Sequence, residues 1–248
     1  MKKLMLVFIS ITIVIIAAAQ DNTSGMVIYE EVDKIDIQID NITPEMAAMI
    51  PKENTNKTVL YFNPKTSLYE NYQADSEGVI EESEGGMHIM ISQPDNIVFS
   101  DFDNKVITEQ KEFMTRTFLI ESDMEKREWK ITGNQKKILN MPCIEAESGS
   151  GDDIIKVWFT PAIPVSTGPS KLAGLPGVIL EMEADSGNKR IVAKDISFNL
   201  EEDKIKKPKK GKKVTKEKFE EIVAAKTKEM GVEGNPEGSK TVIMTISQ

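Results

Sequence analysis

The part of the sequence that says most about the fold is residues 154–183, which read IIKVWFTPAIPVSTGPSKLAGLPGVILEME. Its two ends, Ile154 to Phe159 and Val178 to Glu183, have the length and apolar content of strands. Between them, prolines fix φ and remove amide donors, and glycines permit positive φ. We therefore predict two strands joined by a rigid loop, in which Leu175-Pro176-Gly177 forms a type II turn. Trp158 and Phe159 are expected to be buried and to anchor this loop. The prolines and glycines of the loop are Pro161, Pro164, Gly168, Pro169, Gly174, Pro176 and Gly177.

Short alternating runs of the same kind recur along most of the chain, separated by turn residues. Because these runs do not alternate with helices, an antiparallel sheet is the natural arrangement. The fold class we predict is mainly β (β-rich α+β): an antiparallel curved sheet or partly open barrel. The strands are expected at 26–32, 35–39, 58–63, 67–70, 87–91, 105–109, 117–120, 129–133, around Cys143 to Glu147, 154–159, 178–183, 190–196 and 241–246.

Two helices are expected beside the sheet. A short N-terminal helix, Thr43 to Ile50, has Thr43 as N-cap and Pro44 in the first helical position, and Pro51 stops it. A longer C-terminal helix begins after Thr215 and ends at Gly231. Its apolar face is expected to consist of Phe219, Ile222, Val223, Lys226 and Met230.

The first nineteen residues are typical of a secretory signal peptide. Lys2 and Lys3 precede an apolar run, and Ala17-Ala18-Ala19 supplies the small residues of a cleavage site. The apolar core is short for a membrane anchor, which is the alternative interpretation. Removal of the two lysines takes the formal charge from −9 to −11. We predict a signal peptide over 1–19 and one exported, acidic domain over 20–248, without a transmembrane span after cleavage.

Composition excludes several kinds of site. Cys143 is the single cysteine, so the chain has no internal disulfide and no thiolate metal cluster, and we interpret it as a small core residue. His88 is the single histidine, so a histidine-rich metal site is excluded, and a hydrolytic triad would need this imidazole. A His88 and methionine copper site is a minor alternative. We expect no cofactor and no metal.

The Lys-rich segment 203–214 stands out on an acidic chain, because seven of the ten residues from Lys204 to Lys213 are lysines. The segment contains no arginine or aromatic residue, which argues against nucleic acid. We interpret it as a solvated connector, and contact with an anionic lipid surface is the alternative.

The hydroxyls of Ser166 and Thr167 lie in the rigid loop but have no base near them in the sequence. No nucleophile elbow, phosphate loop or calcium loop is present. These two hydroxyls are therefore expected to bond loop amides.

The loop also carries a resemblance to a known family. The stretch from Phe159 to Pro169, followed by Gly174-Leu175-Pro176-Gly177-Val178-Ile179, resembles the signature of the GLPGLI family, exported proteins found largely in Bacteroidota. Val178 replaces the second leucine of the namesake motif. The resemblance extends over most of the mature chain, including Trp129-Lys130-Ile131 and Cys143 to Ala146. It implies an uncharacterised exported protein, and some members are encoded near TonB-dependent transporters.

Taken together, the sequence predicts an exported, non-catalytic envelope protein that acts as a binding or accessory module. The location would be periplasmic, associated with the outer membrane, or secreted, and the expected partner is an envelope or outer-membrane protein. Two alternatives stay open: a carrier of an apolar ligand in a half-barrel, and a hydrolase that uses His88 or a carboxylate. The expected binding surface comprises Pro161, Pro164, Ser166, Thr167, Gly168, Pro169, Gly174, Leu175, Pro176 and Gly177.

Overall fold

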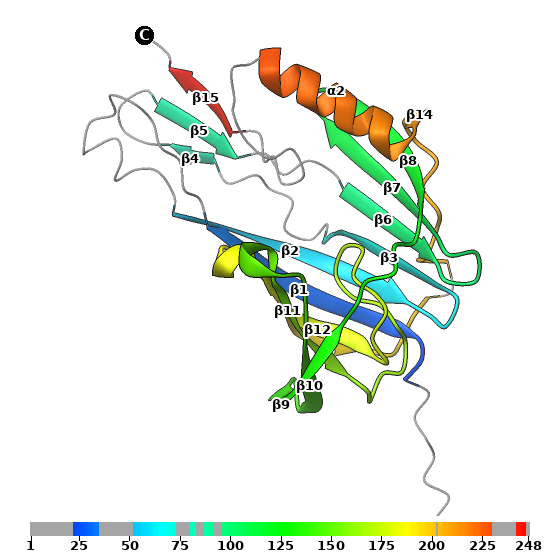
Figure 1. The fold of residues 1–248 in the computed structure, drawn as a ribbon. Coiled ribbons are helices and arrows are strands. Elements are labelled where there is room, and N and C mark those ends of the chain that lie inside the picture. Colours follow the sequence, from blue (N-terminus) through cyan, green and yellow to red (C-terminus); the bar gives the residue numbers. More distant parts are fainter. Residues whose placement is uncertain are drawn as a thin grey trace, which may run out of the picture.

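The protein is built around one open, twelve-stranded sheet, seen here in a computed structural model (Figure 1). The structure describes residues 22–34, 52–72, 80–82, 87–91, 96–201, 203–229 and 242–246. The sheet has the strand order β14-β8-β7-β6-β3-β2-β1-β13-β12-β11-β10-β9, and β15-β5-β4 form a second, three-stranded sheet. The predicted mainly β fold is therefore confirmed, as a sheet that stays open rather than closing into a barrel.

The strands are β1 (Gly25–Lys34), β2 (Glu53–Phe62), β3 (Thr66–Asn71), β4 (Ile80–Glu82), β5 (Met87–Ile91), β6 (Asn96–Asp101), β7 (Val106–Phe113), β8 (Arg116–Asp123), β9 (Lys130–Ile138), β10 (Met141–Ser148), β11 (Ile155–Thr160), β12 (Val178–Ala184), β13 (Lys189–Ser197), β14 (Lys212–Val214) and β15 (Val242–Ile246). Two single 3₁₀ turns, η2 (Gly151–Asp153) and η3 (Asp185–Gly187), and one α-helix, α2 (Lys216–Glu229), complete the described elements.

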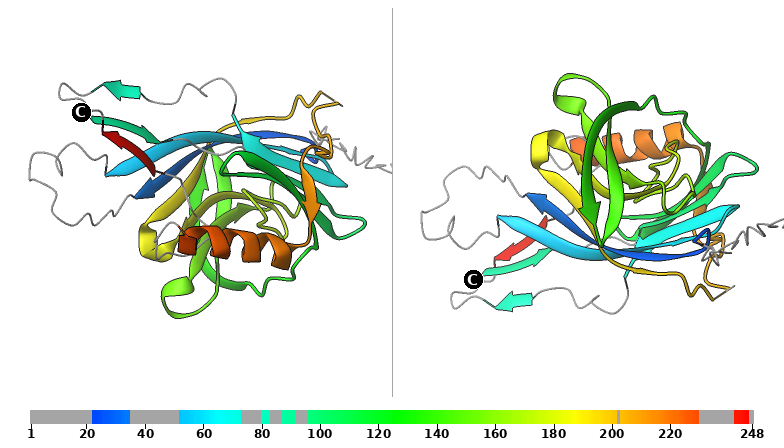
Figure 2. Two further views of the ribbon diagram at one scale, coloured as in Figure 1. Left: turned by 90° about the horizontal axis from the view of Figure 1, so that it is seen from above. Right: turned by 90° about the horizontal axis from the view of Figure 1, so that it is seen from below.

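The large sheet is strongly curved, and both the loop between β11 and β12 and helix α2 lie on its concave side (Figure 2). We call this side the inner face. Side chains that meet the loop or the helix identify it: Ser67 bonds Thr167 of the loop, and Phe118 packs against Phe219 of α2. Because side chains alternate along a strand, these contacts fix which residues of every paired strand share the inner face.

The core lies mainly on the inner face. Val27 and Tyr29 of β1, Leu60 and Phe62 of β2, and Ile191 of β13 are all at most 1% exposed. Strand β12 is buried on both faces, since Val178 to Met182 are all buried. A strand with both faces buried is a continuous apolar run, which is why Val178 to Glu183 could be recognised from the sequence.

Strand pairing is antiparallel everywhere in the large sheet except at one edge. There β14 pairs in parallel with β8, with Lys212 opposite Phe118 and Val214 opposite Ile120. The predicted antiparallel arrangement therefore holds for the rest of the large sheet, whereas the Lys-rich segment, interpreted from the sequence as a solvated connector, forms a short parallel strand at these three residues. Parallel pairing is the geometry open to a segment that enters the edge in the same direction as its neighbour.

Helix α2 confirms the predicted C-terminal helix. The Thr215 hydroxyl accepts a hydrogen bond from the Lys218 amide at 3.2 Å, as expected for the N-cap. Phe219 packs edge-on against Phe113 and Phe118, and Val223 is the buried residue of the helix. The predicted helix Thr43 to Ile50, the predicted strand 35–39 and the signal peptide over 1–19 lie outside the described residues. None of the helices in the described part of the chain has the length and apolar character needed to cross a membrane.

Candidate functional site

The loop between β11 and β12 is half core and half surface. Ile163, Val165 and Leu175 point inward and are at most 4% exposed, whereas Pro164 and Ser166 between them are exposed. The predicted binding residues divide in the same way: Pro161, Pro164, Ser166, Gly174 and Pro176 are exposed, and Thr167, Gly168, Pro169, Leu175 and Gly177 are buried. The loop therefore covers the apolar part of the inner face and offers alternate residues to solvent.

The glycines of the loop serve two different purposes. Gly174 has φ +97° and so needs a glycine for conformational reasons. Gly168 and Gly177 do not have positive φ. At Gly177 a Cβ would lie 2.1 Å from the Thr160 carbonyl oxygen, so the residue is glycine because the backbone of β11 passes too close.

The predicted type II turn at Leu175-Pro176-Gly177 is wrong. The Gly177 amide donates to the Leu175 carbonyl at 2.9 Å, which closes a three-residue turn around Pro176. A type II turn would require positive φ at the glycine, and the close approach of Thr160 favours the tighter turn instead.

Both loop hydroxyls have structural partners. Thr167 Oγ1 donates to Ser67 Oγ at 3.1 Å in a buried contact between the loop and β3. Ser166 Oγ accepts the Gly174 amide at 2.8 Å and ties the two halves of the loop together. The prediction that the hydroxyls bond loop amides is therefore confirmed for Ser166 and wrong for Thr167, whose partner is a hydroxyl of β3.

Three aromatic residues lie near the loop: Trp129, Trp158 and Phe159. The indole N–H of Trp129 donates to the Ala173 carbonyl at 2.8 Å. Phe159 is buried as predicted, but Trp158 is only half-buried and carries the Lys136 ammonium 4.2 Å from its ring centre. The expectation that Trp158 is a buried anchor is therefore wrong, because its side chain lies on the outer face, opposite Phe159.

Beyond the loop, the inner face changes from apolar to polar. On β2 the inner residues run from Phe62 and Leu60 to Thr58, Asn56 and Asn54. Their register partners are also polar: Asn56 lies opposite Glu31, Asn54 opposite Asp33, and Thr58 opposite Asn71. The same row continues to Asn96 on β6 and Lys111 on β7, which lie opposite each other. We call these residues, Glu31, Asp33, Asn54, Asn56, Asn71, Asn96 and Lys111, the polar strip.

A charged network closes one end of the polar strip. Glu31, 8% exposed, forms an ion pair with Lys189, and Lys189 Nζ also lies 3.5 Å from Asp33 Oδ1. The Tyr69 hydroxyl lies 2.8 Å from Thr58 Oγ1 and 3.3 Å from Glu31 Oε2. Burial alone would lower the pKa of Lys189, but Glu31 and Asp33 raise it above its ordinary value. Lys189 therefore keeps its positive charge beside Glu31 and Asp33.

Three amide groups of the polar strip are shielded from solvent without a hydrogen-bond partner. They are Asn54 Nδ2, Asn56 Nδ2 and Asn96 Oδ1, and none has a partner in the described part of the chain. A buried polar atom without a partner costs about 1–3 kcal/mol, so native proteins keep very few of them. All three atoms belong to side chains on the same face of the sheet, in the polar strip.

The remaining residues singled out from the sequence lie elsewhere. Cys143 is buried on β10, and burial raises the pKa of its thiol to about 11, which fits the predicted core role. His88 lies on β5, where its backbone pairs with Glu82 and Thr245. Within the described ranges, no group of three or more His, Cys, Asp or Glu residues could hold a metal ion.

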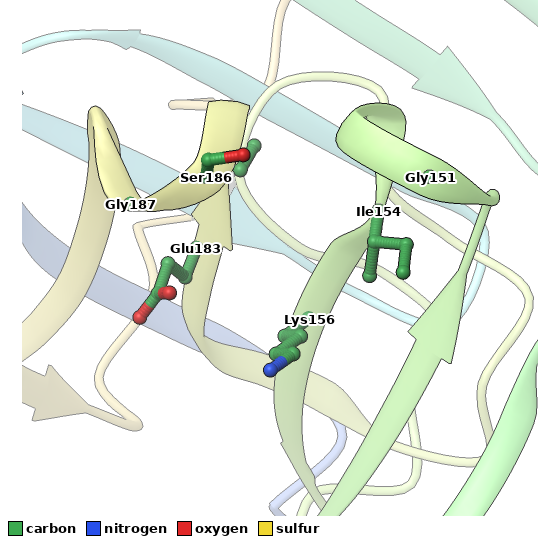
Figure 3. Close-up of a pocket in the computed structure, with 7 residues that line it drawn as sticks. Gly151, Ile154, Lys156, Glu183, Ser186 and Gly187 are labelled. Carbon is green, nitrogen blue, oxygen red and sulfur yellow. The ribbon is translucent and has the colours of Figure 1, made fainter.

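Two hollows are present on the outside of the described structure. One, of about 300 Å³, lies between the two 3₁₀ turns (Figure 3). Ser186 and Gly187 border it on one side and Gly151 and Ile154 on the other, with Lys156 and Glu183 beneath. The second, of about 440 Å³, lies beside β8 and β14.

Comparison with known proteins gives one match to a family profile, in the region of the loop. A family profile described as "Protein of unknown function (Porph_ging)" matches residues 150–181, the segment from η2 to the middle of β12. The match supports an uncharacterised family, and the GLPGLI name itself stays a prediction. No curated protein sequence matches the chain.

The fold itself is similar to solved structures. "Structure of PNGF-II in P21 space group" matches with a TM-score of 0.56 and 14% sequence identity over 82% of this chain. "Structure of PNGF-II in C2 space group" matches with a TM-score of 0.55 and 16% identity over 80% of this chain. The chain spans about a third of the length of these proteins, 33% and 32% respectively. At this level of identity the likeness shows the fold alone.

Proposed function

We propose that the chain is an exported, non-catalytic binding or accessory module, and that it holds a polar, uncharged ligand group against the polar strip. This proposal rests on the three solvent-shielded amide atoms that have no hydrogen-bond partner among the described residues. An asparagine amide presents a donor and an acceptor side by side, so the ligand is expected to offer both acceptors and donors, as hydroxyl or amide groups do.

The geometry of the loop supports a binding role for this face. Its buried residues fill the apolar half of the concave side, and Lys171 bonds Glu109 of β7 at 3.4 Å. An oxygen of the same Glu109 carboxylate lies 3.1 Å from Lys111 Nζ of the polar strip. The part of the inner face that the loop covers therefore borders directly on the polar strip. A wall held in this way is preorganised, and preorganisation lowers the entropic cost of binding.

The two alternatives receive less support from the structure. A carrier of apolar ligands would need the apolar part of the inner face to be open, but Ile163, Val165 and Leu175 of the loop pack there. A hydrolase built on the loop would need a free hydroxyl, and those of Ser166 and Thr167 are engaged in structural bonds. The partial length relative to PNGF-II fits a module that can also form part of a longer chain.

The location remains part of the proposal. Export rests on the charged and apolar pattern of residues 1–19, and the link to outer-membrane uptake rests on the resemblance of the loop to an exported family. A chain purified from the periplasmic fraction with Gln20 at its N-terminus would support export. Retention of Lys2 and Lys3 in the isolated protein would contradict it.

Native mass spectrometry of the chain isolated from its producing cells tests the binding role. We expect a retained polar adduct on the unmodified chain and its loss from N54A/N56A. The matched control is E53A/T55A, which changes two exposed positions of the same strand that face away from the strip. Release of the adduct should also expose β2 amides to hydrogen exchange.

Two results would contradict the proposal. One is an adduct that survives N54A/N56A unchanged, which would place the ligand elsewhere. The other is a bare chain whose β2 amides exchange at the same rate before and after addition of the low-molecular-weight envelope fraction. Far-ultraviolet circular dichroism of each variant would confirm that the sheet is intact.

A further inference from the structure

The Lys-rich segment is not a free connector, because it lies against the outer face of the sheet. Lys204 and Glu201 act electrostatically on the Tyr61 hydroxyl of β2, and Lys207 bonds Glu121 of β8 at 2.8 Å. The segment thus crosses the outer face of the sheet from β2 to β8. Both views in Figure 2 show it on the side of the sheet opposite α2. It ends in β14, paired to Phe118, Leu119 and Ile120.

One residue holds the end of this crossing segment close to the sheet. Gly211 has φ +120°, and a Cβ there would lie 2.9 Å from the Phe118 carbonyl carbon. Both the backbone conformation and the space therefore require glycine. The lysines on either side of Gly211 consequently start from a fixed backbone rather than from a mobile tail.

The second hollow, of about 440 Å³, lies where the segment meets β8. Three lysines, Lys207, Lys209 and Lys213, and the carboxylate of Glu121 line it together with the apolar residues Leu119, Pro208 and Val214. Leu119 is 8% exposed and belongs to the packed sheet. A lining of basic and apolar residues suits a molecule that has an anionic head and an apolar portion.

The charges of the segment are only partly neutralised. Lys204, Lys206 and Lys207 pair with Glu201, Asp203 and Glu121. Among the residues that the structure describes, Lys209, Lys210, Lys212 and Lys213 form no ion pair within 4.0 Å. Hydrogen bonding from Lys207, together with the charge of Lys213, lowers the pKa of Glu121, so this carboxylate stays ionised in the lining of the hollow. The excess of lysines over carboxylates leaves the hollow positive on a chain of net charge −9.

We infer that this hollow binds the phosphate headgroup of an anionic lipid at a membrane surface. Each lysine near an anionic bilayer contributes roughly 1 kcal/mol of attraction, which is about fivefold in affinity, so the three lysines that line the hollow have a large combined effect. The hollow lies on the outer face, whereas the polar strip lies on the inner face. The inference is therefore independent of the proposed function.

Vesicle co-sedimentation of the mature chain tests the inference. We expect binding to vesicles of 30% phosphatidylglycerol in phosphatidylcholine at low salt, and little binding to pure phosphatidylcholine. K209E/K213E should weaken binding about tenfold or more. The matched control, K130E/K137E, makes the same change of charge at exposed positions of β9, on the opposite edge of the sheet, and should bind like the unmodified chain.

A soluble anion separates the lipid from free phosphate. At constant ionic strength, 10 mM inorganic phosphate should leave vesicle binding nearly unchanged, because phosphate lacks the apolar portion that meets Leu119 and Val214. Equal loss of binding in both double variants would show general charge attraction and overturn the site. Absence of binding to the anionic vesicles, or full displacement by phosphate, would overturn the lipid assignment.

Discussion

Gly177→Ala is expected to be among the most damaging single-methyl changes in the protein. The added Cβ would lie 2.1 Å from the Thr160 carbonyl oxygen and 2.6 Å from its carbon. Ordinary contacts begin near 3.4 Å, so the loop or the end of β11 would have to move by more than 1 Å. All the nearest atoms belong to the backbone, so no side-chain rotation can relieve the contact.

The expected cost is about 3 kcal/mol, the upper part of the range for overpacked sites, because residues on both sides of Gly177 are buried. Leu175 and Val178 are at most 3% exposed, and both would be displaced with the turn. Gly133→Ala is the matched control. There the glycine has φ +88° but nothing lies within 4 Å of the added atom, so only backbone strain of about 1 kcal/mol is expected.

Equilibrium unfolding in urea, followed by tryptophan fluorescence, measures both values. Trp129 bonds the loop directly and Trp158 lies on β11, so the two indoles report on the region concerned. A Gly177→Ala chain that is no less stable than Gly133→Ala would refute the argument. Such a result would mean that the turn is loose and that the loop does not fix the inner face.

Four further measurements test other contacts. Ser67→Ala and Thr167→Val should each destabilise the chain by about 1–2 kcal/mol and the double variant by less than their sum, as a double-mutant cycle would show. Lys189→Met should cost about 2 kcal/mol, because Glu31 would lose its partner while 8% exposed; Lys194→Met, at an exposed ion pair, should cost less than about 1 kcal/mol. Hydrogen bonds from Thr132 and then Asn134 lower the pKa of Glu145 in the folded protein. The stabilisation that ionised Glu145 gives the folded state is therefore complete above its unfolded-state pKa and is lost as the pH falls through the lower folded-state pKa. Glu145→Gln should make the free energy of unfolding fall less steeply with pH below about pH 4.5. The Cys143 thiol, with its pKa raised to about 11 by burial, should react with a thiol reagent at pH 8 only after unfolding.

The strands that alternate, and the largely apolar strand β12, could be predicted from the sequence. Strands β1, β8 and β13 were found within a few residues of their ends, and so was α2 with its Thr215 cap. Strand β6 was missed because Ile97, Val98 and Phe99 form a short apolar run next to Asp95 and Asp101, which are typical of turns. Strand β14 was missed because lysines at an exposed edge satisfy no periodic pattern.

The polar strip could not be predicted, because it depends on register between strands far apart in the sequence. Asn56 meets Glu31 only when β1 and β2 pair as they do, and Asn96 joins the row through β3 and β6. In the sequence the asparagines of β2 suggest a turn rather than a strand. The position of the loop between two strands could be predicted, but the reason for glycine at 168 and 177 lies in neighbouring atoms that the sequence does not show.

The position of the loop connects the fold to the proposed binding face. A curved sheet with an apolar concave side would expose that side to solvent unless other residues covered it. Here residues 161–177, the loop between two strands of the same sheet, cover it. Beyond the apolar half that the loop covers, the same face continues as the polar strip. Amides without a partner among the described residues lower the stability of the free chain, so replacement of Asn56 by leucine should raise stability while it removes binding. An opposite result, in which Asn56→Leu destabilises the chain as much as a core deletion, would mean that the strip is part of the core and not a seat for a ligand.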